Sequence, residues 1–478
     1  MYDTKLIDIF LNLNLEEKRK LRKWVLSEFV NKNEDISRFF EFIDSRKKVT
    51  PRTVTKEKAH DYLYPNTPYH DLRIRHLIWM TTEILESFIV YIKMESELSL
   101  REQLLSKFYM QKDLYKHAQK TVESGIELMQ NNKIKNAEHY KNNFQLNSLY
   151  YDIQSRNIRT KDFNIDEVAK TFTVFTILET LKTSSRILSI QKVGETKTKH
   201  ALLEPILLLL KDASFLQLSQ VRIYYNIYLV ATNEDEKAFK QFIKDIKQNE
   251  ILFSMHDLNE LYRLAINFCI KKSNQNQVFY TKQTFELYLY TIENGILIEN
   301  NEISRFIFTN VVTLGIKLKK FARIEEFIKQ YSKFINPTYR KNTIDFNTSK
   351  ILYAKAQRDK ALKILLTNEF KDTIWNLNAK DLILRIYFEQ KNMESFSSNL
   401  NSYRAYVKRK TNIGYHKTYF ITLIEAFKKL QKIYKHPQKH KEYVFTSTTI
   451  NVDWFNKMLK DMQIKKAPIP KFRNGALN

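Results

Sequence analysis

Apolar residues recur three or four positions apart along most of this chain, and that spacing places them on one face of an α-helix. The first two segments show the pattern clearly, from Leu6 to Leu13 and again from Leu15 to Phe29. Asn14 lies between them, and Glu17 would occupy the third helical position of the second segment. This combination predicts a capping box and a helix start. Further helix starts are predicted at Asn33, Thr55 and Asp71.

The pattern divides the chain into four segments. Residues 1–95 are predicted to form an N-terminal helical bundle, and residues 96–215 a helical middle region. In residues 216–435, apolar helices alternate with shorter charged ones at a period of roughly 35–45 residues, which is typical of helical hairpin repeats. Residues 436–478 are predicted to be an extension with an isolated strand-like run, Tyr443–Val452, a short helix, Trp454–Met462, and a flexible tail.

Two of the repeats carry a more specific signal. One has Gly315 in its first helix, Phe321 at the turn and Pro337 after its second helix, and another runs from Leu352 to Leu362. A small residue, a turn aromatic and a terminal proline at these places resemble tetratricopeptide repeats. Because the other units lack the small residues, the repeats are degenerate. The resemblance implies an all-α fold in which the N-terminal bundle is followed by a right-handed α-solenoid.

A second resemblance concerns the first hundred residues. The run Phe29–Asn33 before a Phe-rich helix, then Thr55–Lys58 and Tyr64–Tyr69 with Arg73 and Arg75, is similar to the opening of an uncharacterised helical-repeat protein family common in Bacteroidota. That resemblance implies a helical fold and supplies no functional residue.

Composition excludes several classes of enzyme. The chain has only six glycines in 478 residues, whereas about 7% is usual. Phosphate-binding loops, dinucleotide fingerprints and nucleophile elbows all require glycine, and none occurs. The single Cys269 lies in an apolar stretch and is expected to pack inertly. The most apolar run, Ile206–Leu210, is far too short to span a membrane. We therefore expect a cytoplasmic protein without catalytic residues, cofactor or small-molecule substrate.

Two weak patterns suggest a metal site and a ribonuclease motif, but neither is expected to form a functional site. The pairs His60-Asp61 and His70-Asp71 fall at predicted helix boundaries, where aspartate caps helices, so we predict no metal site. Arg409 and His416 have the spacing of a helical ribonuclease motif, but Gly414 between them indicates a break and a new helix.

The net charge of +26 is the strongest indication of a partner. It attracts acidic proteins or nucleic acid, although an abundance of lysine also arises from compositional bias. We expect a non-catalytic scaffold that binds an acidic protein or peptide on the concave face of the solenoid. For the tyrosines among the predicted contact residues, packing in the core is the alternative. The predicted contact residues are Tyr224, Tyr228, Tyr262, Lys317, Lys319, Lys320, Arg323, Arg404, Lys408, Arg409 and Lys410.

The alternative function is nucleic-acid binding or regulation. In it the N-terminal unit acts as a helix-turn-helix-like module together with lysine-rich surfaces, and Arg73 and Arg75 open the recognition helix, where arginines reach bases or phosphates. The other interpretation of this unit is an ordinary helical bundle with solvated arginines.

Overall fold

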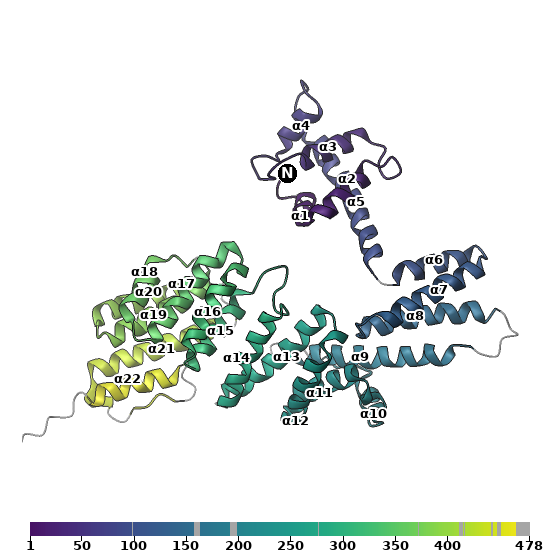
Figure 1. Cartoon of the computed structure of the whole chain (residues 1–478). Coiled ribbons are helices and arrows are strands. Elements are labelled where there is room, and N and C mark those ends of the chain that lie inside the picture. The colour runs from purple at the N-terminus through teal and green to yellow at the C-terminus, as the bar shows by residue number, and fades with distance from the viewer. Residues whose placement is uncertain are drawn as a thin grey trace, which may run out of the picture. The chain divides into compact units, whose positions relative to one another are not determined.

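The computed structural model describes residues 1–97, 99–156, 163–191, 198–275, 277–370, 372–410, 414, 416–440, 443–446 and 451–464. The fold is all-α, as predicted: these residues form helices α1 to α22 and four short 3-10 helices, and they contain no strand beyond an isolated bridge between Glu299 and Glu302 (Figure 1). The chain divides into two compact units, Met1–Ser254 and Met255–Asn478. In the described part, no helix is long and apolar enough to cross a membrane.

The first unit contains α1 to α12. Their bounds are α1 (Lys5–Asn12), α2 (Leu15–Val25), α3 (Glu34–Asp44), α4 (Lys56–Leu63), α5 (Asp71–Ser96), α6 (Leu100–Gln111), α7 (Tyr115–Asn131), α8 (Ala137–Gln154), α9 (Ile165–Gln191), α10 (Leu203–Leu209), α11 (Ser219–Asn233) and α12 (Glu236–Asn249), with 3-10 helices η1 (Phe215–Gln217) and η2 (Glu250–Leu252).

The second unit contains α13 to α22. Their bounds are α13 (Met255–Asn274), α14 (Val278–Glu293), α15 (Arg305–Lys317), α16 (Phe321–Tyr331), α17 (Pro337–Ala354), α18 (Arg358–Thr367), α19 (Thr373–Glu389), α20 (Met393–Arg409), α21 (His416–Lys435) and α22 (Val452–Ile464), with η3 (Ser332–Phe334) and η4 (Pro437–His440).

The predicted helix starts in the N-terminal segment are confirmed. The Asn14 side chain accepts a hydrogen bond from the Glu17 amide at 2.9 Å, and the Glu17 carboxylate accepts one from the Asn14 amide at 2.8 Å. The side chains of Asn33 and Thr55 cap α3 and α4 by accepting from the amides of Asp35 and Lys58, without the reciprocal bond, and α5 begins at Asp71. These caps bond amides that have no partner inside the helix. Helices α1 to α5 then share one hydrophobic core, which includes Phe39, Phe42 and Phe88.

Helices α13 to α22 pack mainly against their neighbours in the chain. Short connections join α15 to α16, α17 to α18 and α19 to α20, and the two helices of each pair are in contact. Pro337 is the first residue of α17, where its fixed φ suits the helix and its missing N–H costs nothing. Asp372 caps α19 by accepting from the amides of Ile374 and Trp375, at 2.9 and 3.1 Å.

The first helices of these pairs also contact one another across the pairs. The amide of Asn347 on α17 donates to the Thr309 hydroxyl on α15 at 3.0 Å. The rings of Phe346 on α17 and Trp375 on α19 lie 5.1 Å apart. On the next pair, Phe388 of α19 meets Tyr434 of α21 at 5.8 Å. We call α15, α17, α19 and α21 the odd-helix row.

The C-terminal segment was predicted only in part. Helix α22 extends two residues beyond the predicted Trp454–Met462 at each end. Of the predicted strand-like run, Tyr443–Thr446 is neither helix nor strand, and residues 447–450 lie outside the described residues. The predicted flexible tail, residues 465–478, lies outside them as well.

Candidate functional site

The three tyrosines predicted as partner-binding anchors lie in the core. Tyr224, Tyr228 and Tyr262 are 3%, 9% and 0% exposed. The Tyr224 ring packs against Phe253 with ring centroids 6.1 Å apart, and Tyr262 packs against Tyr290 at 5.8 Å. Burial of an aromatic ring contributes to stability but removes it from an exposed binding face. The alternative reading, core packing, is the one that the structure supports.

The first predicted basic cluster surrounds the turn between α15 and α16. Lys317, Lys319 and Lys320 are exposed there, and Lys319 takes the left-handed backbone conformation, with a φ of 57°, that reverses the chain. Arg323 is engaged in ion pairs with Glu293 and, at 3.2 Å, with Glu326. This cluster therefore offers three solvated lysines.

The second predicted basic cluster lies at the end of α20. Arg404, Lys408, Arg409 and Lys410 are all exposed. Arg404 and Lys408 line a shallow cavity of about 220 Å³ together with Lys417 of α21. The first cluster follows the end of α15, whereas the second lies beside the start of α21, and α17 to α19 come between them. The structure does not bring the two clusters together.

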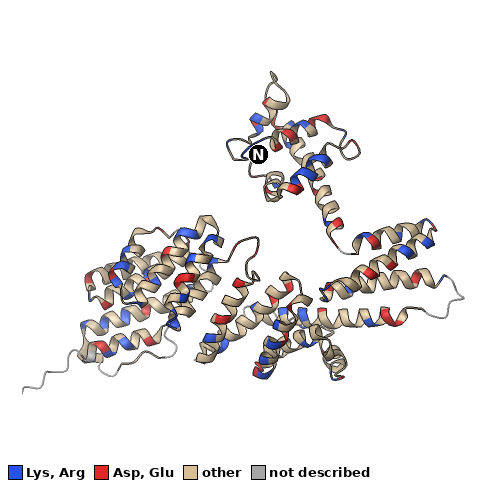
Figure 2. Ribbon diagram, viewed as in Figure 1, with Lys and Arg blue, Asp and Glu red and all other residues tan. Residues whose placement is uncertain are grey.

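The total charge does not point to one face either. Figure 2 shows Lys and Arg on helices throughout the chain with Asp and Glu interspersed among them. The net charge therefore does not locate a binding site on one face.

The arginines of the nucleic-acid alternative are engaged inside the N-terminal segment. Arg73 pairs with Asp35 at 3.4 Å, and its guanidinium lies 3.6 Å from the centre of the Tyr64 ring. Arg75 pairs with Asp71. Hydrogen bonds from Lys56, Tyr69 and Arg75 lower the pKa of Asp71, so this carboxylate is held by several cations and donors at once.

The two weak sequence patterns do not assemble into a site. Arg409 ends α20 and His416 begins α21, so they are on different helices, as Gly414 had indicated. His70 is the N-cap of α5 and accepts from the Arg73 amide at 3.3 Å. Among the described residues, no group of three or more His, Cys, Asp or Glu side chains is placed to hold a metal ion.

A site that was not predicted lies on the odd-helix row. A cavity of about 510 Å³ opens among all four helices of the row. Its wall combines aromatic rings with amide and hydroxyl groups, which is the mixture typical of a recognition pocket. The residues are Phe306, Thr309, Asn310, Phe346, Ile374, Trp375, Asn378, Tyr419 and Phe420.

One helical turn along α17 from this cavity lies a lysine without a counter-ion. The Lys350 ammonium donates to the Thr313 hydroxyl at 2.5 Å, and no described carboxylate is within ion-pair distance of it. Burial by the surrounding protein and the nearby Arg385 lower the pKa of Lys350 to about 8. Arg385 itself is paired with Asp381 at 2.7 Å. Lys350 and Arg385 are thus neighbouring cations, and the carboxylate of Asp381 is paired with Arg385.

No protein family, curated protein or solved structure matches the chain.

A sequence signal for this site existed. Thr343, Asn347 and Lys350 are four and three positions apart, so they share one face of α17. Asn347 is fully buried, and its amide donates to the Thr343 carbonyl at 2.9 Å, while its side-chain oxygen has no hydrogen-bond partner among the described residues. Thr343 and Asn347 are buried and Asn347 bonds to Thr309, so this polar stripe marks the face on which α17 packs against α15 through hydrogen bonds.

Proposed function

We propose that this chain is a non-catalytic helical-repeat scaffold that binds an acidic segment of a protein partner. In this proposal α1 to α5 form an N-terminal bundle, and the later hairpins form a tetratricopeptide-like right-handed solenoid. The odd-helix row is its concave face. Support comes from the consecutive contacts along the row and from the positions of Gly315 and Pro337.

The observation that carries the proposal is the uncompensated Lys350 ammonium. The Lys350 side chain is partly buried, and the neighbouring Arg385 repels its charge. An anion beside the ammonium would therefore stabilise it. An acidic side chain of a bound peptide would supply the missing carboxylate. Such a charge-assisted hydrogen bond contributes about 1.5–3 kcal/mol.

The adjoining cavity favours a ligand that also carries an apolar side chain. Phe306 is 53% exposed at its wall, while Trp375 behind it is only 5% exposed and is held by the core. An aromatic or aliphatic side chain would pack on such a wall, since apolar surface removed from water stabilises a complex. The preferred ligand is a peptide that has an acidic residue close to an apolar one.

The same features favour protein over nucleic acid. Recognition of phosphates along a nucleic acid uses a line of unpaired basic groups, with arginine preferred for bidentate contacts. Here Arg73 and Arg75 pair with carboxylates, and the exposed basic groups at the end of α15 and the end of α20 form two separate clusters and no continuous line. Nucleic-acid binding is therefore the outcome that would count against the proposal.

Fluorescence anisotropy with labelled hexapeptides tests this function. The probes are Glu-rich peptides with one phenylalanine, the same peptides with Lys in place of Glu, and a single-stranded RNA. We expect only the acidic peptides to bind, and Lys350→Gln to weaken them about tenfold or more.

Lys363→Gln is the matched control, because Lys363 is exposed on α18, outside the row. It removes the same charge and should leave the affinity unchanged. Equal losses in the two variants would show that only net charge matters. No binding of acidic peptides at low salt, or tighter binding of RNA, would refute the proposal.

A further inference from the structure

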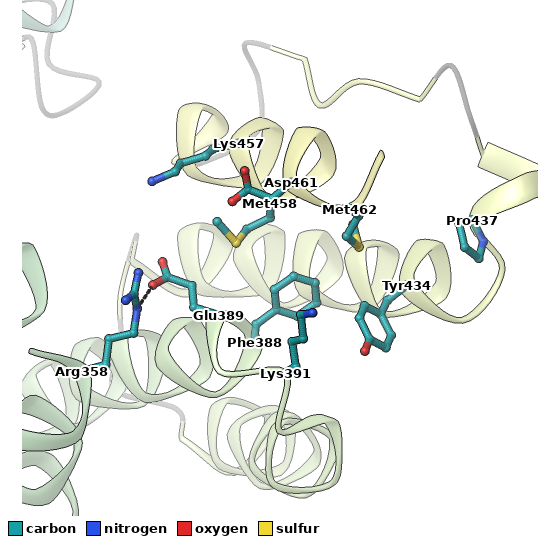
Figure 3. Close-up of a pocket in the computed structure, with 10 residues that line it drawn as sticks. All are labelled: Arg358, Phe388, Glu389, Lys391, Tyr434, Pro437, Lys457, Met458, Asp461 and Met462. Atoms are coloured by element: carbon teal, nitrogen blue, oxygen red, sulfur yellow. Dashed lines mark hydrogen bonds and ion pairs between the residues drawn. The ribbon is translucent and has the colours of Figure 1, made fainter. Parts of the chain in front are cut away.

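A second cavity lies in the C-terminal part of the chain, away from the wall just described. It has a volume of about 480 Å³ and is formed where α19 and α21 end and α22 packs over them. Figure 3 shows its lining side chains: Phe388, Tyr434 and Met462 lie toward one end with Lys391 beside them, and Arg358, Glu389 and Lys457 lie toward the other. The cavity has an apolar end and a charged end.

The apolar end is formed by side chains that suit a flexible ligand. Phe388 and Met458 are almost fully buried, at 4% and 5% exposed, and Met462 and Tyr434 complete this part of the wall. Methionine side chains are unbranched and polarisable, so they adapt to ligands of different shape. This end would take a hydrocarbon chain or ring.

At the charged end, Glu389 holds Arg358 in place. The Glu389 carboxylate accepts hydrogen bonds from the Tyr353 hydroxyl at 2.5 Å and from the Trp454 indole at 2.8 Å, and it pairs with the Arg358 Nε. Burial by itself would raise the pKa of Glu389, but these three donors outweigh it and lower the pKa. Because Glu389 takes only the Nε, the two Nη groups of Arg358 have no hydrogen-bond partner among the described residues.

The charges around the cavity do not balance. Lys391 and Lys457 also line it, and neither forms an ion pair with any described residue. Against these two lysines and Arg358 stand only Glu389 and Asp461. The wall therefore carries one excess positive charge, which a ligand with one negative charge would neutralise. The Asp461 carboxylate would repel a second negative charge on the ligand.

We propose that this cavity binds a small monocarboxylate with an apolar body. The carboxylate would lie against the Arg358 Nη groups and Lys457, and the apolar body against Phe388, Met458 and Met462. A cavity of this volume has room for on the order of 16 water-sized groups, since a water occupies about 30 Å³ in the liquid. A medium-chain fatty acid fits within it.

Methyl NMR of the full chain labelled with ¹³C-methyl methionine tests the proposal. The probes are octanoate, octylamine and octanol, which share the chain and differ in the charge of the head group. We expect octanoate to shift the Met458 and Met462 signals saturably, and to leave that of Met129, buried in the first unit, in place. The amine should cause no shift, and the alcohol should bind at least about tenfold more weakly.

Two variants on α22 separate the head-group contact from the general charge. Lys457→Gln should weaken octanoate several-fold. Lys460→Gln, an exposed position of the same helix that does not line the cavity, should not. Both changes are at exposed sites, and unchanged thermal melting confirms that each variant is folded.

The proposal is overturned if octanoate shifts neither methionine up to its solubility limit. It is also overturned if octylamine binds as well as octanoate, or if Lys460→Gln weakens binding as much as Lys457→Gln. None of these results depends on peptide binding at the odd-helix row, so the two proposals fail separately.

Discussion

Replacing Gly315 by alanine tests how closely α15 and α16 must approach. A methyl group on Gly315 would lie 2.1 Å from the Cγ2 atom of Ile324 and 3.2 Å from the Cε2 atom of Phe285. Ile324 is fully buried and branched at Cβ, so its Cγ2 cannot turn away without moving the side chain. Overpacking of this kind costs about 1–3 kcal/mol, and this contact is close enough for the upper half of that range.

Helix propensity acts in the opposite direction. Alanine is favoured over glycine inside a helix by about 1 kcal/mol. The net expectation for Gly315→Ala is a decrease of about 1–2 kcal/mol in the free energy of unfolding of the second unit.

Urea unfolding monitored by pulse labelling of Cys269 measures this change. Cys269 is the only cysteine of the chain and is fully buried in α13, so its labelling reports unfolding of the second unit alone. Gly125→Ala in α7 is the control. It has the same gain in propensity, but its closest contact is the flexible Leu146 Cδ2 at 2.8 Å, so its stability, followed by circular dichroism, should stay within about 1 kcal/mol of wild type.

A double-mutant cycle identifies the clash itself. Ile324→Ala alone should cost about 2–5 kcal/mol, and clearly less in the Gly315→Ala background, because the shortened side chain makes room for the new methyl group. If Gly315→Ala is as stable as wild type, or if the two changes are additive, the argument from close packing is wrong.

Three further results are expected. Binding of acidic peptides should weaken as the pH rises above about 8, where Lys350 loses its proton, and Lys350→Arg should abolish this dependence. In the unfolded chain the lysine has its ordinary pKa of 10.5 and binds the proton more tightly. The contribution of Lys350 to folding stability should therefore increase as the pH rises from about 8 to 10.5. Burial raises the pKa of Cys269 to about 12, so a disulfide reagent at pH 8 should label the native thiol orders of magnitude more slowly than the unfolded one, and rapid labelling would contradict its placement. Asp245→Ala should lower the unfolding free energy of the first unit by about 2–3 kcal/mol in urea titrations, because it removes the carboxylate that lies 2.8 Å from the Arg222 Nε. An unchanged urea midpoint would show that this ion pair contributes nothing to stability.

Local features were well predicted from the sequence. The capping box of Asn14 and Glu17 involves residues three positions apart, and the same holds for the Thr55 cap of α4. Such contacts form within one turn of backbone and need no tertiary partner. The scarcity of glycine likewise indicated an all-α chain, because glycine is needed for the tight turns and close backbone approaches of other folds.

The orientation of each helix face was decided by tertiary structure. Tyr262 and Phe306 both belong to apolar helical patterns, yet one is fully buried and the other is 53% exposed. Periodicity shows that a helix has an apolar face, but not which neighbour covers it or how far the cover extends. The predicted tyrosine anchors failed for this reason.

The sequence by itself determined that helices fill the chain and where the capped helices of the N-terminal segment begin, since both depend on residues within a turn or two of one another. Only the tertiary structure decided which charges remain unpaired. Lys350 lies next to Thr313, 37 positions before it in the sequence, and next to Arg385, 35 positions after it. Arg358 pairs with Glu389, which is 31 positions away. Whether a lysine is solvated, paired or left without an anion depends on those distant helices, because the free energy of a charge is set by the groups and the water around it.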